Sequence, residues 1–343
     1  MRARGFSLLE FMIAMTIGLF MIAGLVYLIA ETSRSRAEIE RSSRQIENGR
    51  YAIDRIAEDL RHAGFFSEFF EVPTSGATGF PATLTAAAPC AVTIAGLPAG
   101  MPLAIQAYDG GASVPSDLSA CLASADYQPN TDILVVRRAS TSTIAKTATL
   151  VADQPYIQTT PAAYKLDTGT NLGTFTLTFP TTNTTATVDA PLHRYVVRIY
   201  FVSKCNVPAS GATCDGTTDD GGTPIPTLKM LELGPGPAFQ KLAVAEGIEQ
   251  LQFDFGIDDT GDGVADRIVM CTSGAPCSTA DWSNVVSVQV NLVARNTETS
   301  PAYADDKTYS LGLKGYTTAT NDRYRRHSYS TFVRLNNIAM RRE

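Results

Sequence analysis

A single carboxylate, Glu10, stands at the start of a long apolar segment of this chain. Residues 11–30 are uncharged and mostly apolar. A helix of that length, at about 1.5 Å per residue, crosses a hydrocarbon layer of roughly 30 Å. Placing a carboxylate beside such a layer raises the free energy of membrane insertion by about 2.5–3.5 kcal/mol, so we expect Glu10 to interact with a polar or charged group. One option is an interface position near lipid headgroups, and the other is an ammonium group that neutralises Glu10 among packed helices.

A second group of oxygen-bearing residues follows at positions 258–266. Asp258, Thr260, Asp262, the carbonyl of Val264 and Asp266 occupy positions 1, 3, 5, 7 and 9 of a calcium-binding loop. The twelfth position is valine instead of the bidentate glutamate, so we expect at most a weak calcium site. A polar Asp-Gly hairpin loop between two strands is the favoured interpretation, and no other cofactor is indicated.

The cysteines favour disulfides over metal binding. Their number is even, and no C-x-x-C spacing of a zinc site occurs. Six cysteines allow fifteen connectivities, of which we prefer the one that joins nearest neighbours. These pairs are Cys90 with Cys121, Cys205 with Cys214, and Cys271 with Cys277.

Catalytic residues are not evident in the sequence. The three histidines, His62, His193 and His327, are far apart along the chain, and no G-x-S-x-G, H-E-x-x-H or phosphate-binding loop is present. We therefore expect a protein that is not an enzyme, with a signal-anchored enzyme or adhesin as the alternative from another class.

Composition narrows the class of protein further. The chain has 343 residues, a formal net charge of −6 and 44% hydrophobic residues, which is ample for a large core. A pI near 5.2 argues against nucleic acid as a partner. The arginines at positions 323–342 are expected on a solvated strand face.

A long helix must carry Glu10. No proline interrupts residues 6–63, and Gly64 is a natural C′ residue. After the apolar residues 6–30, residues 31–64 are amphipathic, and Arg55 with Asp59 is one of several i,i+4 ion pairs expected on the polar face. The expected core stripe of this second half comprises Ile39, Ile46, Ile53 and Leu60.

The remainder of the chain is predicted to be rich in β-strands. Residues 65–131 lack a sustained period, but residues 174–179, 251–255 and 286–292 alternate apolar and polar residues as half-buried strands do. Residues 132–137, 195–202 and 227–233 are further strand candidates. The expected fold class is α+β, with a mainly antiparallel sheet packed on the amphipathic half of the helix and further β-rich insertions.

The N-terminus resembles the signal of type IV prepilins. The sequence Arg-Gly-Phe-Ser-Leu-Leu-Glu at residues 4–10 combines a short basic leader, a glycine, an aromatic residue and an acid five residues beyond the glycine. The resemblance implies cleavage between Gly5 and Phe6, methylation of Phe6 by the prepilin peptidase/N-methyltransferase, and pairing of Glu10 with an α-amino group in the filament. The expected division is leader 1–5, transmembrane and assembly helix 6–30, amphipathic helix 31–64 and periplasmic head 65–343.

Two C-terminal segments, residues 247–266 and 329–337, resemble PilW-type minor pilins. That family implies a structural subunit that helps initiate type IV pilus assembly and lies at or near the tip. Its implied partners are other minor pilins, the major pilin, a tip adhesin and the inner membrane. The J-type minor pseudopilin of type II secretion is the nearest alternative. Because Arg2 and Arg4 precede the apolar segment, we expect a single-pass inner-membrane protein with a periplasmic C-terminus, and a pilus location after assembly.

Overall fold

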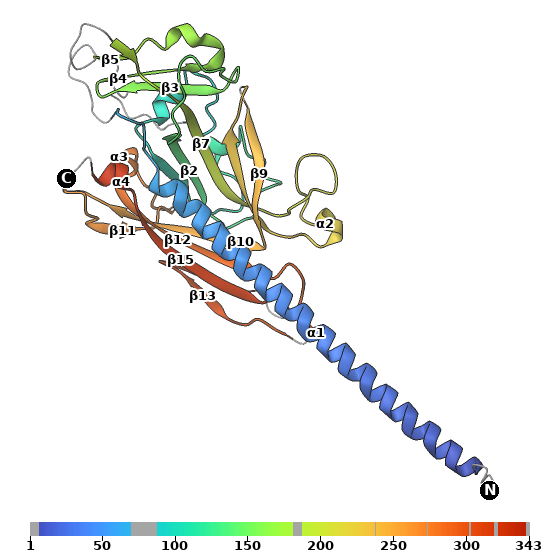
Figure 1. The fold of residues 1–343 in the computed structure, drawn as a ribbon. Helices are drawn as coiled ribbons and strands as arrows, with labels where there is room; N and C mark the ends of the chain where they lie inside the picture. Colours follow the sequence, from blue (N-terminus) through green and yellow to red (C-terminus); the bar gives the residue numbers. More distant parts are fainter. Residues whose placement is uncertain are drawn as a thin grey trace.

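A long helix projects from a β-rich head in the computed structural model of the chain (Figure 1). The structure describes residues 7–69, 88–180, 187–236, 238–272, 274–301, 303–318 and 322–340. Helix α1 spans Leu8–Arg61, 54 residues. The fold is the α+β, type IV pilin-like arrangement expected from the sequence, with a mainly antiparallel head.

Both ends of α1 have local causes. At the N-terminus, Ser7 is the N-cap and Glu10 completes a capping box, in which each side chain accepts a hydrogen bond from the other residue's backbone N–H. At the C-terminus, His62 is the C-cap and Gly64 has φ +71°, a left-handed conformation that glycine adopts without strain. Phe6, where the sequence places the mature N-terminus, lies outside the described residues.

The larger of two sheets has seven antiparallel strands in the order β1-β2-β7-β3-β4, with β8 paired to β7 and β9 paired to β8. β7 is the longest strand, and it pairs with β2, β3 and β8. The strands are β1 Ile105–Tyr108, β2 Ile133–Ala139, β3 Pro155–Thr160, β4 Ala163–Thr168, β7 Leu192–Ser203, β8 Thr227–Leu233 and β9 Phe239–Glu246.

The smaller sheet has four antiparallel strands in the order β11-β10-β12-β15. They are β10 Ile248–Ile257, β11 Arg267–Val269, β12 Val285–Arg295 and β15 Arg326–Arg334. Two hairpins accompany the sheets, β5 Thr178–Pro180 with β6 Thr187–Asp189, and β13 Thr308–Leu311 with β14 Lys314–Thr317. The short helices are η1 Leu97–Gly100, η2 Ser116–Leu118, η3 Gly169–Thr174, α2 Asp219–Gly222, α3 Thr279–Ser283 and α4 Asn336–Ala339.

The main core joins α1 to both sheets. Ile56 and Leu60 of α1 are fully buried in one cluster with Tyr200 of β7 and with Phe253 and Val290 of the smaller sheet. Successive residues of β7 point to opposite faces, as the period of a strand requires. Its other face therefore builds a second cluster, which the irregular segment 88–131 covers.

Two of the expectations about packing were wrong. Ile39 is 66% exposed because it precedes Gln45, the first buried residue of α1, and Ile46 is 40% exposed although it follows Gln45. Residues 174–179 do not form one strand: η3 ends at Thr174, and β5 begins only at Thr178. Phe175 instead turns inward to a small buried cluster, so tertiary packing overrides the local alternation.

Candidate functional site

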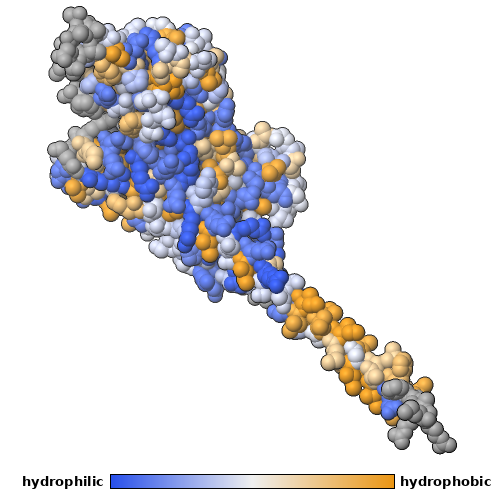
Figure 2. Space-filling view, viewed as in Figure 1, coloured by the Kyte–Doolittle hydropathy of each residue, from blue (hydrophilic) through white to orange (hydrophobic). Residues whose placement is uncertain are grey.

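The first half of α1 has no contact with the head. Its large apolar side chains from Leu8 to Ile29 are all more than half exposed. Figure 2 shows them as a hydrophobic rod that protrudes from a largely hydrophilic head. Among the described residues, α1 is the one helix that is long and apolar enough to cross a membrane. A surface of this kind requires lipid or other helices as its surroundings.

Glu10 lies on this rod, near its end. Its carboxylate accepts a hydrogen bond of 3.0 Å from the backbone N–H of Ser7. The acid therefore interacts with the positive end of the helix in the isolated chain, and it lies within one turn of the N-terminus. Gly5 and Phe6, the expected cleavage and methylation sites, lie outside the described residues.

The second half of α1 is held on the head by close packing. Gly49 faces the ring of Tyr329 on β15, and a Cβ atom built on Gly49 would lie 2.3 Å from Cε2 of that ring. The Gln45 amide donates hydrogen bonds to the backbone oxygens of Ala294 and Arg325, at 2.7 and 3.0 Å. Gly49 is therefore a contact site between the helix and the sheet.

Asp59 anchors the end of α1 to the larger sheet, a role that the sequence pattern does not predict. Its side chain is fully buried, and its two oxygens accept hydrogen bonds from Arg198 Nη1 at 2.6 and 2.8 Å. Arg138 Nη2 lies 3.0 Å away, and the Tyr200 hydroxyl also donates to the carboxylate. The expected pair of Asp59 with Arg55 was wrong, because Arg55 pairs with Glu58 instead.

The arginines determine the charge state of this network. Burial raises the pKa of Asp59, but the hydrogen bonds and charges of Arg198 and Arg138 outweigh it and hold the pKa below its usual value. Asp59 is thus a carboxylate at neutral pH. The only sequence signal for it is its position next to Leu60 on the apolar side of the helix.

A second buried network corrects the expectation for one of the C-terminal arginines, Arg326, whereas Arg323, Arg325 and Arg334 are exposed as expected. The side chain of Arg326 is 1% exposed and not solvated. It forms ion pairs with Glu249 at 2.5 Å, Asp305 at 3.1 Å and Asp322 at 2.6 Å. These acids come from three separate segments, so β15 is tied to β10 and to the connections around β13.

Asp132 links the two sheets. Its carboxylate accepts hydrogen bonds from the backbone N–H groups of Gly110 and Phe253, at 3.0 and 2.9 Å, and its own N–H donates to Leu251. Burial raises the pKa of Asp132 to about 7, although these hydrogen bonds and the charge of Lys314 act in the opposite direction. This side chain therefore titrates near neutral pH within the folded head.

The acidic loop forms the hairpin between β10 and β11. The carboxylate of Asp258 accepts hydrogen bonds from the backbone N–H groups of Gly261, Asp262 and Gly263. That of Asp266 accepts from the N–H of Thr260, at 2.9 Å. The carboxylates thus close the loop on its own backbone, as a polar hairpin loop does. Calcium binding through Asp258, Thr260, Asp262, Val264 and Asp266 stays a prediction, which calorimetry on Asp262→Ala tests.

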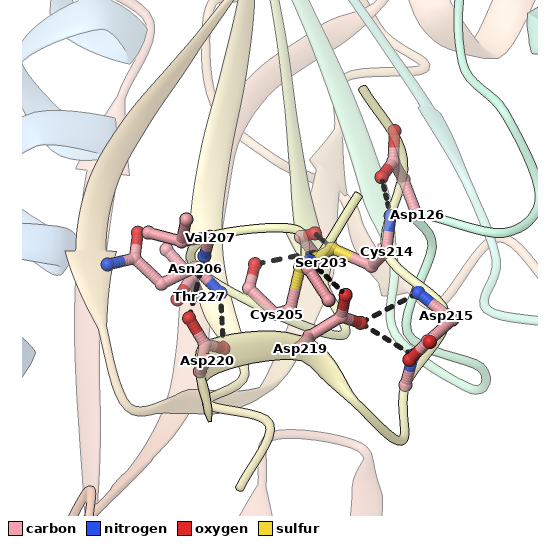
Figure 3. Close-up of a disulfide and its surroundings, with 12 residues drawn as sticks. Asp126, Ser203, Cys205, Asn206, Val207, Cys214, Asp215, Asp219, Asp220 and Thr227 are labelled. Carbon is pink, nitrogen blue, oxygen red and sulfur yellow. Dashed lines mark hydrogen bonds between the residues drawn. A yellow bond between two sulfur atoms is a disulfide. The ribbon is translucent and has the colours of Figure 1, made fainter. Parts of the chain in front are cut away.

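Three disulfides are present, and each joins the cysteines nearest in sequence: Cys90–Cys121, Cys205–Cys214 and Cys271–Cys277. Figure 3 shows the second of them beside the Asp219 carboxylate. Cys205, Cys214 and Asp219 lie close enough together to resemble a metal site. The sulfur atoms are joined in a disulfide, however, and Asp219 accepts hydrogen bonds from the N–H groups of Ala209, Asp215 and Gly216. This group therefore has a structural explanation.

The histidines lie on separate elements. His62 caps α1, and its Nδ1 lies 2.9 Å from the Glu58 carbonyl oxygen. His193 is buried on β7, with Nδ1 2.7 Å from the Ser140 carbonyl oxygen. His327 on β15 packs edge-on against the ring of Tyr329. Each imidazole is thus engaged with its own structural neighbour.

The fold and the exposed rod together define a class of protein. A helix that begins near the N-terminus, with an uncovered apolar first half and a second half packed on an antiparallel head, is the architecture of a type IV pilin-like protein.

Comparison with known families agrees with that class. Residues 211–337 match the model of the type IV pilus-assembly protein W family, and residues 1–26 match the prokaryotic N-terminal methylation motif. A PilW domain behind a methylation motif is consistent with a PilW-type pilin related to the type IV pilus. The members of the matched family are pilus-assembly proteins. The comparisons with curated proteins and with solved structures gave no match.

Proposed function

We propose that this protein is a minor pilin that helps initiate type IV pilus assembly and lies at or near the pilus tip. The observation that carries this proposal is the helix α1, which leaves its first half uncovered over residues 8–30 while the head holds its second half. Lipid covers this surface before assembly, and the helices of other pilins cover it afterwards. The PilW domain supports the type IV pilus over type II secretion as the system that it serves.

Three residues at the N-terminus carry the assembly step in this proposal. The peptidase cuts after Gly5, Phe6 becomes the methylated terminus, and Glu10 pairs with the α-amino group of a neighbouring pilin. Among the described residues, the Glu10 carboxylate accepts a hydrogen bond from the neutral N–H of Ser7. Exchange of that contact for an ammonium group favours assembly, because a charged hydrogen bond in an apolar surrounding is stronger than a neutral one.

The proposal includes a location and partners. Before assembly the chain spans the inner membrane once, with the leader in the cytoplasm and the head in the periplasm, where its disulfides persist. Its partners there are the prepilin peptidase and the other minor pilins. After assembly it contacts the major pilin and a tip adhesin.

The test combines mass spectrometry of the mature N-terminus with a charge variant. We expect the chain to begin at methylated Phe6, and Glu10→Gln to be processed normally but excluded from pili. Glu31→Gln, at the end of the apolar segment, is the matched control and should assemble as the wild type does. An intact Met1, or normal pilus entry of Glu10→Gln, would refute the proposal.

A further inference from the structure

One edge of the smaller sheet presents unpaired backbone groups. β15 pairs with β12 and forms a border of the sheet. Leu335 N donates to Val286 O, and Asn296 N donates to Arg325 O. Because hydrogen-bonded pairs alternate along an antiparallel ladder, the odd-numbered residues of β15 direct their N–H and C=O groups toward β12. The even-numbered residues direct theirs away from the sheet.

These outward groups lack partners. Within the part of the chain that the structure describes, the backbone N–H and C=O groups of Ser328, Ser330 and Phe332 make no hydrogen bond. The neighbouring hairpin of β13 and β14 lies over the face of the sheet, where Leu311 packs with Val293 and Gly312 approaches Asp254. The edge from Ser328 onward is thus a free template for another strand.

A groove of about 400 Å³ adjoins this edge on the outer face of the sheet. Its walls include Phe332 and Val264, each 62% exposed, and Arg334 contributes a guanidinium group. Ser287 also lines it. Ser287 is 4% exposed, and its hydroxyl has no hydrogen-bond partner among the described residues. A buried hydroxyl without a partner is costly, so its position in a groove indicates a ligand that satisfies it.

The register brings these groups together. Ser287 lies opposite Arg334 on one side and opposite Gly256 on the other. A Cβ atom on Gly256 would lie 2.2 Å from the Ser287 Oγ, so the glycine makes room for the hydroxyl. The groove therefore places one guanidinium group, which also donates to the Gly263 carbonyl oxygen, and one hydroxyl between two apolar walls, and a carboxylate is the group that suits both polar partners.

We propose that the β15 edge from Ser328 to Arg334 binds an extended, acid-bearing segment of a partner protein as an added β-strand. The backbone of that segment pairs with Ser328, Ser330 and Phe332. One of its Asp or Glu side chains enters the groove, where Arg334 and Ser287 bind the carboxylate. This site is on the head and does not depend on the role proposed for Glu10.

Charge complementarity selects a foreign strand over a second copy of this chain. The proposed edge itself, Ser328–Arg334, contains one basic residue, Arg334, and no acid. The nearby Arg325 and Arg326 are already paired with acids of this chain. A second copy paired through the same edge would therefore bring no carboxylate to the groove, whereas an acid-bearing strand of a partner protein does.

The test uses the full chain in detergent micelles and two synthetic peptides, Thr-Val-Thr-Val-Glu-Val-Thr and its Gln counterpart, each labelled with fluorescein. Fluorescence anisotropy should show saturable binding of the Glu peptide, with the Gln peptide binding about 10-fold more weakly. Arg334→Gln should weaken the binding of the Glu peptide by a similar factor and leave the affinity for the Gln peptide unchanged. Arg323→Gln, an exposed arginine outside the groove, is the matched control and should change neither affinity.

Ser330→Pro tests the backbone part of the inference. Proline removes an outward N–H but spares the ladder to β12, so this variant should fold normally and lose both peptides. Absence of saturable binding by the Glu peptide would overturn the proposal, as would full binding by Ser330→Pro. If the wild type dimerises and Ser330→Pro abolishes the dimer, the edge binds a second copy of this chain, and the proposal is overturned as well. Pilus entry of Glu10→Gln bears on the proposed assembly role and leaves these outcomes unchanged.

Discussion

Replacement of Asp59 by asparagine should loosen the attachment of α1 to the larger sheet. The amide side chain would keep the volume of the carboxylate but not the charge that Arg198 and Arg138 face. Removal of one partner from a buried ion pair costs about 3–5 kcal/mol. Arg198 retains a second partner, Glu232, at 2.8 Å, so we expect the lower end of this range, about 3 kcal/mol.

The sign of the pH dependence distinguishes this mechanism from a packing defect. Because the folded-state pKa of Asp59 lies below 3.8, its stabilising contribution is fully present above pH 3.8. It is lost as the pH falls through the folded-state pKa. The difference in unfolding free energy between the wild type and Asp59→Asn should therefore be constant at neutral pH and shrink below pH 3.8.

Thermal unfolding of the full chain in detergent measures the effect. Circular dichroism follows the whole fold, and the fluorescence of Trp282, the only tryptophan, follows the core of the smaller sheet. A loss of about 3 kcal/mol corresponds to a Tm decrease of roughly 6–12 °C in a head of this size. Asp54→Asn, on the exposed side of the same helix, should change stability by less than about 0.5 kcal/mol. Equal midpoints for the two variants would refute the reasoning.

Asp132→Asn should flatten the dependence of unfolding free energy on pH. The folded-state pKa of Asp132, about 7, exceeds the ordinary 3.8, so between these pH values the folded wild type binds a proton that the unfolded chain does not. Its free energy of unfolding therefore decreases by roughly 4 kcal/mol as the pH rises from 3.8 to 7. Chemical denaturation at a series of pH values measures this slope. Gly49→Ala should destabilise the head by about 1–3 kcal/mol in the same assay, because the new methyl group would overlap the Tyr329 ring.

Each of these variants has a control. Asn130 is an exposed neighbour of Asp132, and Asn130→Asp should leave the slope of unfolding free energy between pH 4 and 7 nearly unchanged. A flatter slope in this variant as well would contradict the role of Asp132. Gly24 has open space around it, so Gly24→Ala should leave the stability of the head unchanged. If Gly49→Ala were as stable as Gly24→Ala, the predicted overlap of the new methyl group with the Tyr329 ring would be refuted.

The parts of this protein that can be predicted from sequence are those specified by local patterns, namely the long helix, several strands and one hairpin. The helix to Arg61 follows from the absence of proline and the glycine at position 64. Strands β10 and β12 follow from alternation, and the hairpin after β10 follows from its Asp-Gly sequence. Each of these signals resides in a few consecutive residues, so the chain itself specifies them.

The sequence by itself determined the apolar helix, the acid at its start and the α+β class. Only the tertiary structure decided which charges are buried. Asp59 and Arg326 look like surface residues in sequence. Asp59, however, meets Arg138 and Arg198, 79 and 139 residues away, and Arg326 meets Glu249, 77 residues away. Ile39 looks like a core residue but is 66% exposed, although its neighbours Glu38 and Arg41 form ion pairs with the head. The unpaired edge of β15 likewise depends on which strands become neighbours. Burial and pairing arise from contacts between distant segments, and a local pattern carries no information about them.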